Sequence, residues 1–215
     1  MLRKTEPELL DTLPVDHPDA LDFRRDMRRI NALMGNFRWF ARVLPGVVHR
    51  AESQLELGAG VGELCSYLAE RGHPLDGLDL WPAPPDWPPE RTWHRADLVS
   101  FDGYPRYRVV LGNMIFHQFT DAAIAQLGEK LRSHARVILA CEPLRRRALQ
   151  PLYRLVARLA GANHVSIHDG HVSIAAGFLG DELPRLLGLK HDEWRWQCHT
   201  TLLGAYRMIA VRRSS

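Results

Sequence analysis

Three alternating glycines follow a short apolar run in the segment LELGAGVGEL, residues 55–64. Gly58, Gly60 and Gly62 stand behind that run, which also carries the carboxylate of Glu56. Glycine lets a backbone turn sharply and come close to a ligand. In a parallel sheet, ligands bind outside the carboxyl ends of the strands. The segment therefore predicts a strand, a ligand-binding turn and a helix, in that order.

Strands and helices alternate through the rest of the chain. Strands are expected over 53–57, 74–80, 92–96, 106–113 and 135–141, with helices over 62–72, 120–132, 144–161 and 180–189. The last two strands, 192–200 and 205–213, are separated by TLLG and predict a closing antiparallel hairpin. The pattern predicts an α/β, Rossmann-like fold with a mostly parallel seven-stranded sheet and helices on both faces.

Residues 1–50 are predicted to form a helical segment, and residues 51–215 the ligand-binding domain. Gly35 is expected to divide the helical segment into two helices. Two roles stay open for the segment: a lid or cap that closes over the site, or helices packed on a sheet edge. An apolar stripe at spacings near three and four supports an amphipathic helix: Leu21, Met27, Ile30, Met34 and Phe37.

The composition argues against several classes of partner. The 215-residue chain carries a formal charge of +3, from 28 basic and 25 acidic residues, and shows no basic stripe of the kind that binds nucleic acid. No stretch approaches ~18 uninterrupted apolar residues, so no stable membrane insertion is expected. The first residues lack the apolar core of a signal peptide. Three widely spaced cysteines without a CxxC pair favour reduced thiols and a cytoplasmic location.

The glycine spacing distinguishes between two nucleotide cofactors. A dinucleotide fingerprint has its third glycine three residues after the second, where this chain has Glu63. Asp79, about 20 residues beyond the first glycine, suits the ribose of either cofactor. No Tyr-x-x-x-Lys pair occurs, and no residues remain for a separate substrate domain. These features disfavour a nicotinamide or flavin oxidoreductase.

Residues 50–142 resemble a class I S-adenosylmethionine-dependent methyltransferase domain. The matching segments, in order, are LELGAGVGEL, GLDL, ADLVSF, VVLGNMIFHQF and VILACEP. The phrases DMRRINALMGNFRW, FHQF and HDGHVSIAAGF are also similar to a bacterial subgroup of small-molecule methyltransferases, suspected of acting on polyketide or phenolic products. The resemblance implies the class I methyltransferase fold, S-adenosylmethionine as cofactor and S-adenosylhomocysteine as product.

The resemblance also implies a role for each position of the first motifs. Gly58, Ala59 and Gly60 would pass under the amino-acid end of the cofactor. Glu56 would support the ammonium group, directly or through water, and Asp79 would accept hydrogen bonds from both ribose hydroxyls. A sulfonium cation suits a site that carries these two carboxylates.

The adenine and methionine portions are assigned to later motifs in the same way. Leu80 or Trp81 would pack on the adenine. Asp97 would accept from the adenine amino group, and the Leu98 amide would donate to the ring. Asn113 would line the methionine portion. A turn or helix-cap role for Asp97 stays open.

Methyl transfer to oxygen benefits from a base that removes the acceptor's proton, and histidine has a suitable pKa. His117 follows the fourth strand between Phe116 and Phe119 and is the first candidate. A histidine that only orders the chain is the alternative. Phe116 and Trp39 are candidates for the acceptor pocket.

A second candidate base lies in HVSIHDGHVSIAAGF, where histidines surround Asp169. His168 would be the base, and His171 would contact the acceptor. A metal site and a structural turn are the alternatives, and the intervening residues argue against a helix. No metal is expected, because the clustered aspartates of metal-dependent catechol-type methyltransferases are missing around the fourth strand.

The expected function is methylation of a small, largely apolar acceptor, phenolic or polyketide in nature, at oxygen. A non-catalytic methyltransferase-fold subunit that supports a partner enzyme is the alternative. Amino-group methylation of protein or RNA is disfavoured, because GNMIFHQF lacks an Asn/Asp-Pro-Pro-Tyr motif. The sequence leaves the acceptor's identity and the oligomeric state open.

Overall fold

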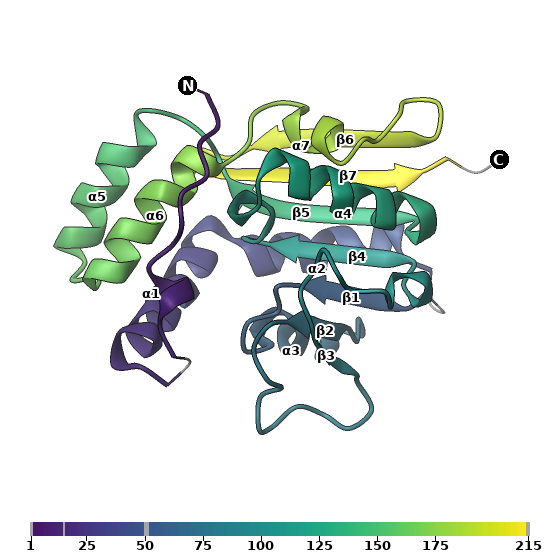
Figure 1. Ribbon diagram of the computed structural model, residues 1–215, viewed down its shortest axis with the longest axis horizontal. Helices are drawn as coiled ribbons and strands as arrows, with labels where there is room; N and C mark the ends of the chain where they lie inside the picture. Colours follow the sequence, from purple (N-terminus) through teal and green to yellow (C-terminus); the bar gives the residue numbers. More distant parts are fainter. Residues whose placement is uncertain (1, 15, 50–51, 214–215) are drawn as a thin grey trace.

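Seven strands form one sheet in the order β3-β2-β1-β4-β5-β7-β6 (Figure 1). The computed structural model describes residues 2–14, 16–49 and 52–213. The first five strands pair in parallel, and β7 runs antiparallel to both β5 and β6. The predicted fold class is confirmed, the closing hairpin included. The strands are β1 (Gln54–Leu57), β2 (Asp76–Asp79), β3 (Trp93–Arg95), β4 (Val109–Asn113), β5 (Val137–Pro143), β6 (Trp194–Thr200) and β7 (Ala205–Arg212).

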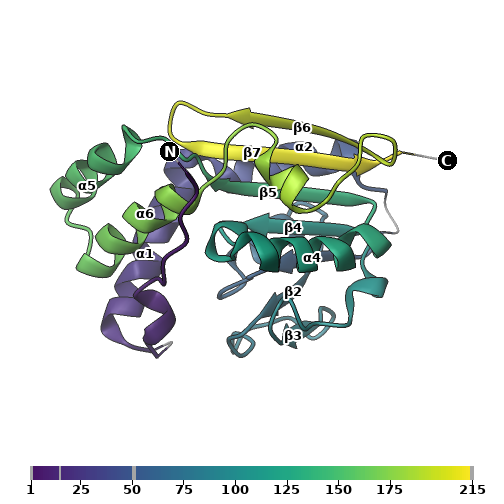
Figure 2. The same cartoon turned by 45° about the horizontal axis from the view of Figure 1, so that its top comes forward.

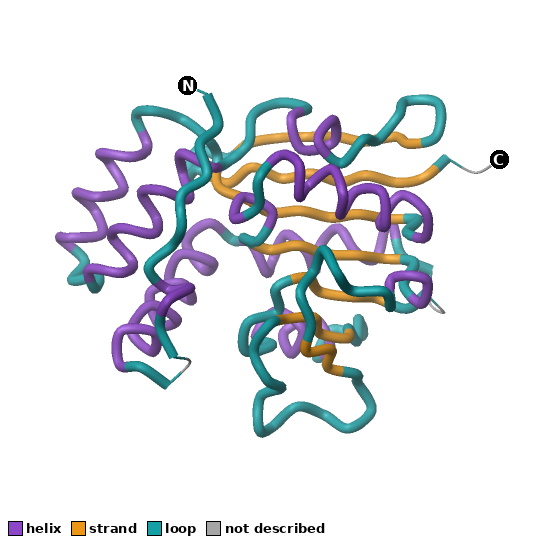
Figure 3. The backbone as a smooth tube through the Cα atoms, in the orientation of Figure 1, coloured by secondary structure: helices purple, strands orange, loops and turns teal. Residues whose placement is uncertain are grey.

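Helices cover both faces of the sheet (Figure 3). The α-helices are α1 (Pro18–Met34), α2 (Asn36–Val47), α3 (Glu63–Ala69), α4 (Asp121–His134), α5 (Leu149–Leu159), α6 (His164–Ala176) and α7 (Glu182–Leu186). Helices α2 and α3 pack on one face, and α4 and α7 pack on the other. Helices α1, α5 and α6 stand together beyond the carboxyl ends of the parallel strands (Figure 1). Within the described ranges, no helix is long and apolar enough to span a membrane.

Alternate side chains of the central strands enter two separate cores. In β4, Val110 faces the core beneath α4, and its neighbours Val109 and Leu111 face the core beneath α2. In β5, Ile138 and Leu139 divide in the same way. Because both faces of these strands are covered, apolar residues are needed at successive positions, which explains the continuous apolar run of β5.

The segment around Asp169 is a helix, and the expectation of a turn there is wrong. Asn163 caps α6, because its side chain accepts from the Ser166 amide at 2.8 Å. Gly170 lets α6 lie against α5, since a Cβ at this position would be 2.3 Å from the ring of Tyr153. The cap and the close packing outweigh the weak helix propensity of the sequence. Helix α5, which precedes α6, is also shorter than the helix expected over 144–161, since it begins at Leu149 and ends at Leu159.

Gly35 divides the N-terminal helices as predicted, with a φ of 68°. Helix α2 belongs to the scaffold, because Trp39, Phe40 and Leu44 are buried in the core beneath it. Helix α1 stands beyond the edge of the sheet, so the lid role stays a prediction for α1 and not for α2. The boundary expected between residues 50 and 51 lies outside the described residues.

Residues 2–13 form an N-terminal strap that runs along α6 to the start of α1 (Figure 1). Near its start, the guanidinium of Arg3 donates to the carbonyl of Phe119 at 2.6 Å. Farther along, the amides of Leu9 and Leu10 donate to the carboxylate of Asp169 at 2.8 and 3.0 Å. The short 3-10 turn η1 (Leu10–Thr12) is thereby held beside α6.

Substitution by alanine at two helical glycines should change the free energy of unfolding in opposite directions. At Gly128 in α4, a Cβ would lie 2.4 Å from the backbone oxygen of Leu187, so Gly128→Ala should lower the free energy of unfolding. At the exposed Gly46 in α2, a Cβ meets nothing within 4 Å, so Gly46→Ala should raise it by up to about 1 kcal/mol. Urea unfolding of both variants measures the difference. Equal changes in the two variants would contradict the close packing of α4 on Leu187.

Candidate functional site

A cavity of about 450 Å³ opens at the carboxyl ends of β1, β2 and β4. This edge is the point where the strand order reverses between β1 and β4, the usual ligand site of an open α/β sheet. Helix α1 and the N-terminal strap complete its walls. The residues that the sequence assigned to the cofactor all line it: Glu56, Gly58, Ala59, Gly60, Asp79, Leu80, Asp97, Leu98 and Asn113.

The glycine turn forms the floor of this cavity. Gly58 has a φ of 61°, and a Cβ there would lie 2.5 Å from the Ile115 side chain, so no other residue fits without displacement. Gly60, with a φ of 60°, has open space around its Cβ position. Its amide donates to the carboxylate of Asp79 at 2.8 Å, which fixes the turn against the end of β2.

The carboxylate of Asp79 bridges two loops at the cavity. One oxygen accepts from the Gly60 amide and the other from the Trp81 amide, each at 2.8 Å. Burial raises the pKa of Asp79, although these two amides counteract the effect. Each oxygen keeps a further lone pair for a ligand hydroxyl. Leu80 beside it is 62% exposed, so its side chain is free to cover a flat ligand.

Glu56 is a buried carboxyl group at the bottom of the cavity, only 3% exposed. Its oxygen lies 2.9 Å from the thiol of Cys65. Burial raises the pKa of Glu56 to about 8, because the thiol bond offsets the loss of solvation only in part. Within the described ranges no cation pairs with it. A cationic ligand group would therefore find an acidic partner here.

Asp97 serves the turn after β3 and also faces the cavity. One of its carboxylate oxygens accepts from the Ser100 amide at 2.9 Å, which is the turn role that the sequence left open. The neighbouring Leu98 is buried, and its carbonyl accepts from the Tyr104 hydroxyl at 2.8 Å. These bonds position both residues at the cavity wall without occupying the second oxygen of Asp97.

Asn113 belongs to a cluster of three asparagines that ties α1 and α2 to the end of β4. The Asn113 amide donates to Asn31 at 3.2 Å, and Asn36 donates to both of its neighbours at 3.0 and 3.2 Å. Asn31 also lines the cavity. Sequence reasoning assigned a role only to Asn113, although Asn31 and Asn36 both lie in the phrase DMRRINALMGNFRW.

His117 does not line the cavity, contrary to the expectation for a base. Its ring is 3% exposed and lies between two carboxylates, with Nδ1 2.7 Å from Glu142 and Nε2 3.3 Å from Glu8. Burial lowers its pKa, but hydrogen bonds to Glu142 and Glu8 outweigh burial and raise the pKa to about 9. A protonated ring clamped in this way has no free nitrogen to accept a proton.

The remaining candidates for chemistry also lie away from the cavity walls. His168 is partly exposed and contacts Asp169 at 2.8 Å, and His171 lies against Gln150 on the side of α5. Trp39 and Phe116 are buried in the two cores. On α6, the helix of the two other histidines, His164 is exposed and lies 3.9 Å from Asp19 of α1.

Three further residues that line the cavity received no role from the sequence. Asp11 comes from the strap, and burial raises the pKa of its carboxyl group, with the charge of Glu8 adding to the effect. Arg24 comes from α1 and has a buried Nη1 without a hydrogen-bond partner among the described residues. Met114 has a φ of 60°, which is strained for a side chain of this size, and follows Asn113 directly.

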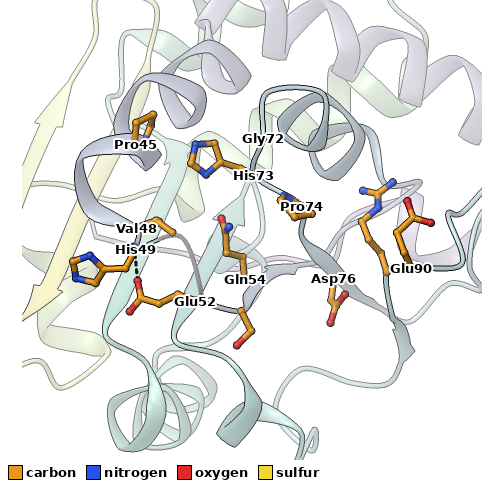
Figure 4. Close-up of a pocket in the computed structure, with 12 residues that line it drawn as sticks. Pro45, Val48, His49, Glu52, Gln54, Gly72, His73, Pro74, Asp76 and Glu90 are labelled. Carbon is orange, nitrogen blue, oxygen red and sulfur yellow. Dashed lines mark hydrogen bonds between the residues drawn. The ribbon is translucent and has the colours of Figure 1, made fainter.

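A second cavity, of about 550 Å³, opens at the opposite edge of the sheet (Figure 4). It lies at the amino ends of β1 and β2 and is lined by Gln54, His73 and Asp76, among others. Two of its acidic residues already have protein partners: Glu52 pairs with Arg136, and Asp76 accepts from the Thr92 amide and the Tyr107 hydroxyl. No group of residues in the described structure forms a metal site, here or elsewhere.

Comparisons with known proteins address the fold. No protein-family model matches the chain. The uncharacterized methyltransferase YrrT of Bacillus subtilis (strain 168) is 27% identical over 115 residues, and the match covers 48% of this chain. That match spans 54%, about half, of the length of YrrT.

Solved structures match over a longer part of the chain. The plantazolicin methyltransferase BpumL, in complex with a monoazolic desmethylPZN analog and SAH, gives a TM-score of 0.69 at 12% identity, over 92% of this chain and 91% of BpumL. The pyocyanin biosynthetic protein PhzM gives 0.61 at 18% identity, over 92% of this chain and 60% of PhzM. This chain has the class I methyltransferase fold. The resemblance seen in the sequence motifs is thereby confirmed at the level of the fold.

Replacing Glu56 should change how stability depends on pH. The pKa of Glu56 is about 8 in the folded protein and near 4.5 when exposed, so between these values only the unfolded chain releases the proton. The free energy of unfolding therefore falls as pH rises through this window, by at most about 1.4 kcal/mol per pH unit from this group. Glu56→Gln should remove that slope in urea unfolding at pH 5, 6.5 and 8.

A matched variant is Glu70→Gln, because the Glu70 side chain is 74% exposed at the end of α3. It should keep the pH dependence of the unmodified protein. An unchanged slope in Glu56→Gln would show that Glu56 is ionised in the folded protein at neutral pH.

Proposed function

We propose that the protein is an S-adenosylmethionine-dependent methyltransferase that acts on a small molecule. The observation that carries the proposal is the convergence of nine motif residues, at or just after the carboxyl ends of four strands, on one cavity. Its volume of about 450 Å³ is within the usual range for a ligand site. The solved structures of BpumL with SAH and the name of YrrT support the same activity. No observation favours the alternative of a non-catalytic subunit.

The polar groups of the cavity fit the parts of this cofactor. Glu56, without a protein cation beside it, would receive the ammonium group, and the Asp79 oxygens would receive the ribose hydroxyls. Arg24, with its buried and unpaired Nη1, would receive the carboxylate. When bound, the cofactor supplies an electrophilic methyl group. The protein's part is to orient the acceptor in line with that methyl and to exclude water.

The other walls of the cavity indicate which kind of acceptor it would bind. Phe23 and Met27 from α1, Phe37 from α2, and Phe119 after β4 present apolar surface, with Leu10 from the strap opposite. These side chains favour a small, largely apolar acceptor. We assign O-methylation because one carboxylate, Asp11, stands among these apolar groups, and burial raises its pKa toward that of a useful base.

Calorimetry tests the cofactor assignment. S-adenosylhomocysteine should bind the purified protein, and NADH should give no heat. Asp79→Ala should weaken S-adenosylhomocysteine binding by roughly 1–3 kcal/mol, because a charged acceptor of hydrogen bonds is lost. Asp102→Ala, at a carboxylate that is 94% exposed, should bind like the unmodified protein. Micromolar NADH binding without binding of the sulfur ligand would overturn the assignment.

Kinetic and stability measurements should distinguish a catalytic role of Asp11 from a structural role of His117. Mass spectrometry of a bacterial small-molecule extract incubated with methyl-labelled S-adenosylmethionine identifies an acceptor for the assay. Asp11→Asn should then lower kcat by roughly 10²–10⁴-fold with unchanged S-adenosylhomocysteine affinity. His117→Gln should lower the unfolding temperature instead, most strongly below pH 6.5, because the stabilisation from its raised pKa is lost as pH rises through about 9.

The control for Asp11 is Asp22→Asn, which removes an exposed carboxylate of α1 that pairs with Arg25 outside the cavity. Its kcat should not change. If Asp11→Asn is fully active while His168→Ala is inactive, the base belongs to α6 and the assignment of Asp11 is wrong.

Hydrogen exchange tests the lid. Amides of α1 should gain protection against exchange when S-adenosylhomocysteine binds. Arg24 of this helix would contact the ligand, and Asn31 is bonded to Asn113 at the end of β4. Amides of α2 should not change, since that helix is already fixed in the core. Full protection of α1 in the free protein would make it a fixed wall and not a lid.

A further inference from the structure

The outer face of α5 is apolar and largely exposed in the described part of the chain. Leu152, Leu155, Val156 and Leu159 are 53%, 57%, 50% and 80% exposed. The other side of the helix packs on α6, through Ala157 and through Tyr153, whose hydroxyl donates to the carbonyl of Ser166 at 2.7 Å. Figures 1 and 2 show α5 as the outermost element at this end of the molecule.

The turn between β6 and β7 extends this apolar surface. Leu202 is fully exposed and Leu203 is 56% exposed at its tip. The turn lies against the start of α5, since a Cβ at Gly204 would be 3.2 Å from the side chain of Leu149. Six of the twelve exposed large apolar side chains among the described residues thus belong to two adjacent elements. We call this set, four on α5 and two on the turn, the apolar end.

The charged residues of the segment that carries α5, residues 143–168, are all arginines. No acidic residue occurs between Glu142 and Asp169, and none occurs in the TLLG turn. Arg146 and Arg147 precede α5 and are exposed. Arg154 and Arg158 are exposed on the polar side of α5. An apolar face flanked by arginines is typical of a helix that lies in the interface of an anionic membrane.

We propose that the apolar end docks the protein peripherally on a bilayer with anionic headgroups. Leucines of α5 and of the turn enter the boundary of the acyl chains, and the four arginines contact the phosphates. A second copy of the chain fits less well, because pairing this surface with itself would place arginines opposite arginines. The proposal does not depend on the methyltransferase assignment, since the apolar end shares no residue with the cavity.

Vesicle flotation with the full chain tests the proposal. The protein should float with vesicles of phosphatidylcholine and phosphatidylglycerol at a 70:30 ratio, and not with phosphatidylcholine alone. Binding should weaken when salt is raised, because the attraction to headgroups is screened. Arg154→Gln/Arg158→Gln should lower the partition coefficient up to about 30-fold. Leu155→Ser/Leu159→Ser should lower it at least about tenfold, by loss of buried apolar surface.

The control is Leu21→Ser/Leu33→Ser, which removes two leucines of α1 that are 51% and 62% exposed and lie outside the cavity lining. It should float like the unmodified protein. Circular dichroism and unfolding temperature check that each variant is folded, which the exposure of the substituted side chains favours. Absence of binding to the anionic vesicles, or equal binding by Leu155→Ser/Leu159→Ser, overturns the proposal. A dimer that this variant dissociates, without vesicle binding, assigns the surface to self-association.

Discussion

The carboxylate of Glu142 holds together the segments that build the cavity. It stands fully buried near the end of β5, and one of its oxygens accepts from the amides of Ile115 and Phe116, each at 3.0 Å. The other oxygen contacts the His117 ring at 2.7 Å. These bonds fix the turn after β4, which carries Ile115 against the glycine floor. Through the ring of His117 the same connection reaches Glu8 and the N-terminal strap.

This row of charged side chains also changes the pKa of a cavity residue, although neither Glu8 nor His117 lines the cavity. Burial alone would raise the pKa of Glu8, but hydrogen bonds and the charge of His117 outweigh it and lower the pKa, so Glu8 stays ionised. That charge in turn helps to raise the pKa of Asp11, three residues along the strap. Removing one member of a buried ion cluster leaves the others without compensation, which is why such clusters tolerate substitution poorly. His117 is thus a positioning residue for the strap.

Sequence reasoning recovered the parts of the site that are encoded locally. Each candidate cofactor residue lies at or just after the carboxyl end of a strand, so the strand pattern and the glycine run located this edge of the sheet, and the resemblance to class I methyltransferases suggested the roles of Glu56, Asp79 and Asn113. The partners of His117 could not be found in this way, because Glu142 is 25 residues away and Glu8 lies at the other end of the domain. Helix α6 was missed for a related reason: its stability comes from burial against α1 and α5, and its own sequence has weak propensity.

The two halves of the cavity therefore differ in how easily they can change. The half of the cavity that we propose for the cofactor rests on backbone turns in which a Cβ at Gly58 would collide with Ile115, so its shape is fixed by sterics. The half that we propose for the acceptor is made mainly by side chains of α1 and the strap, with Phe37 and Phe119, and hydrogen bonds that do not involve the glycine turn hold α1 and the strap in place. Substitutions at Leu10, Phe23 or Met27 alter the surface offered to an acceptor without moving the glycine floor. A class I sheet can thus keep one cofactor while its N-terminal segments adapt to different acceptors.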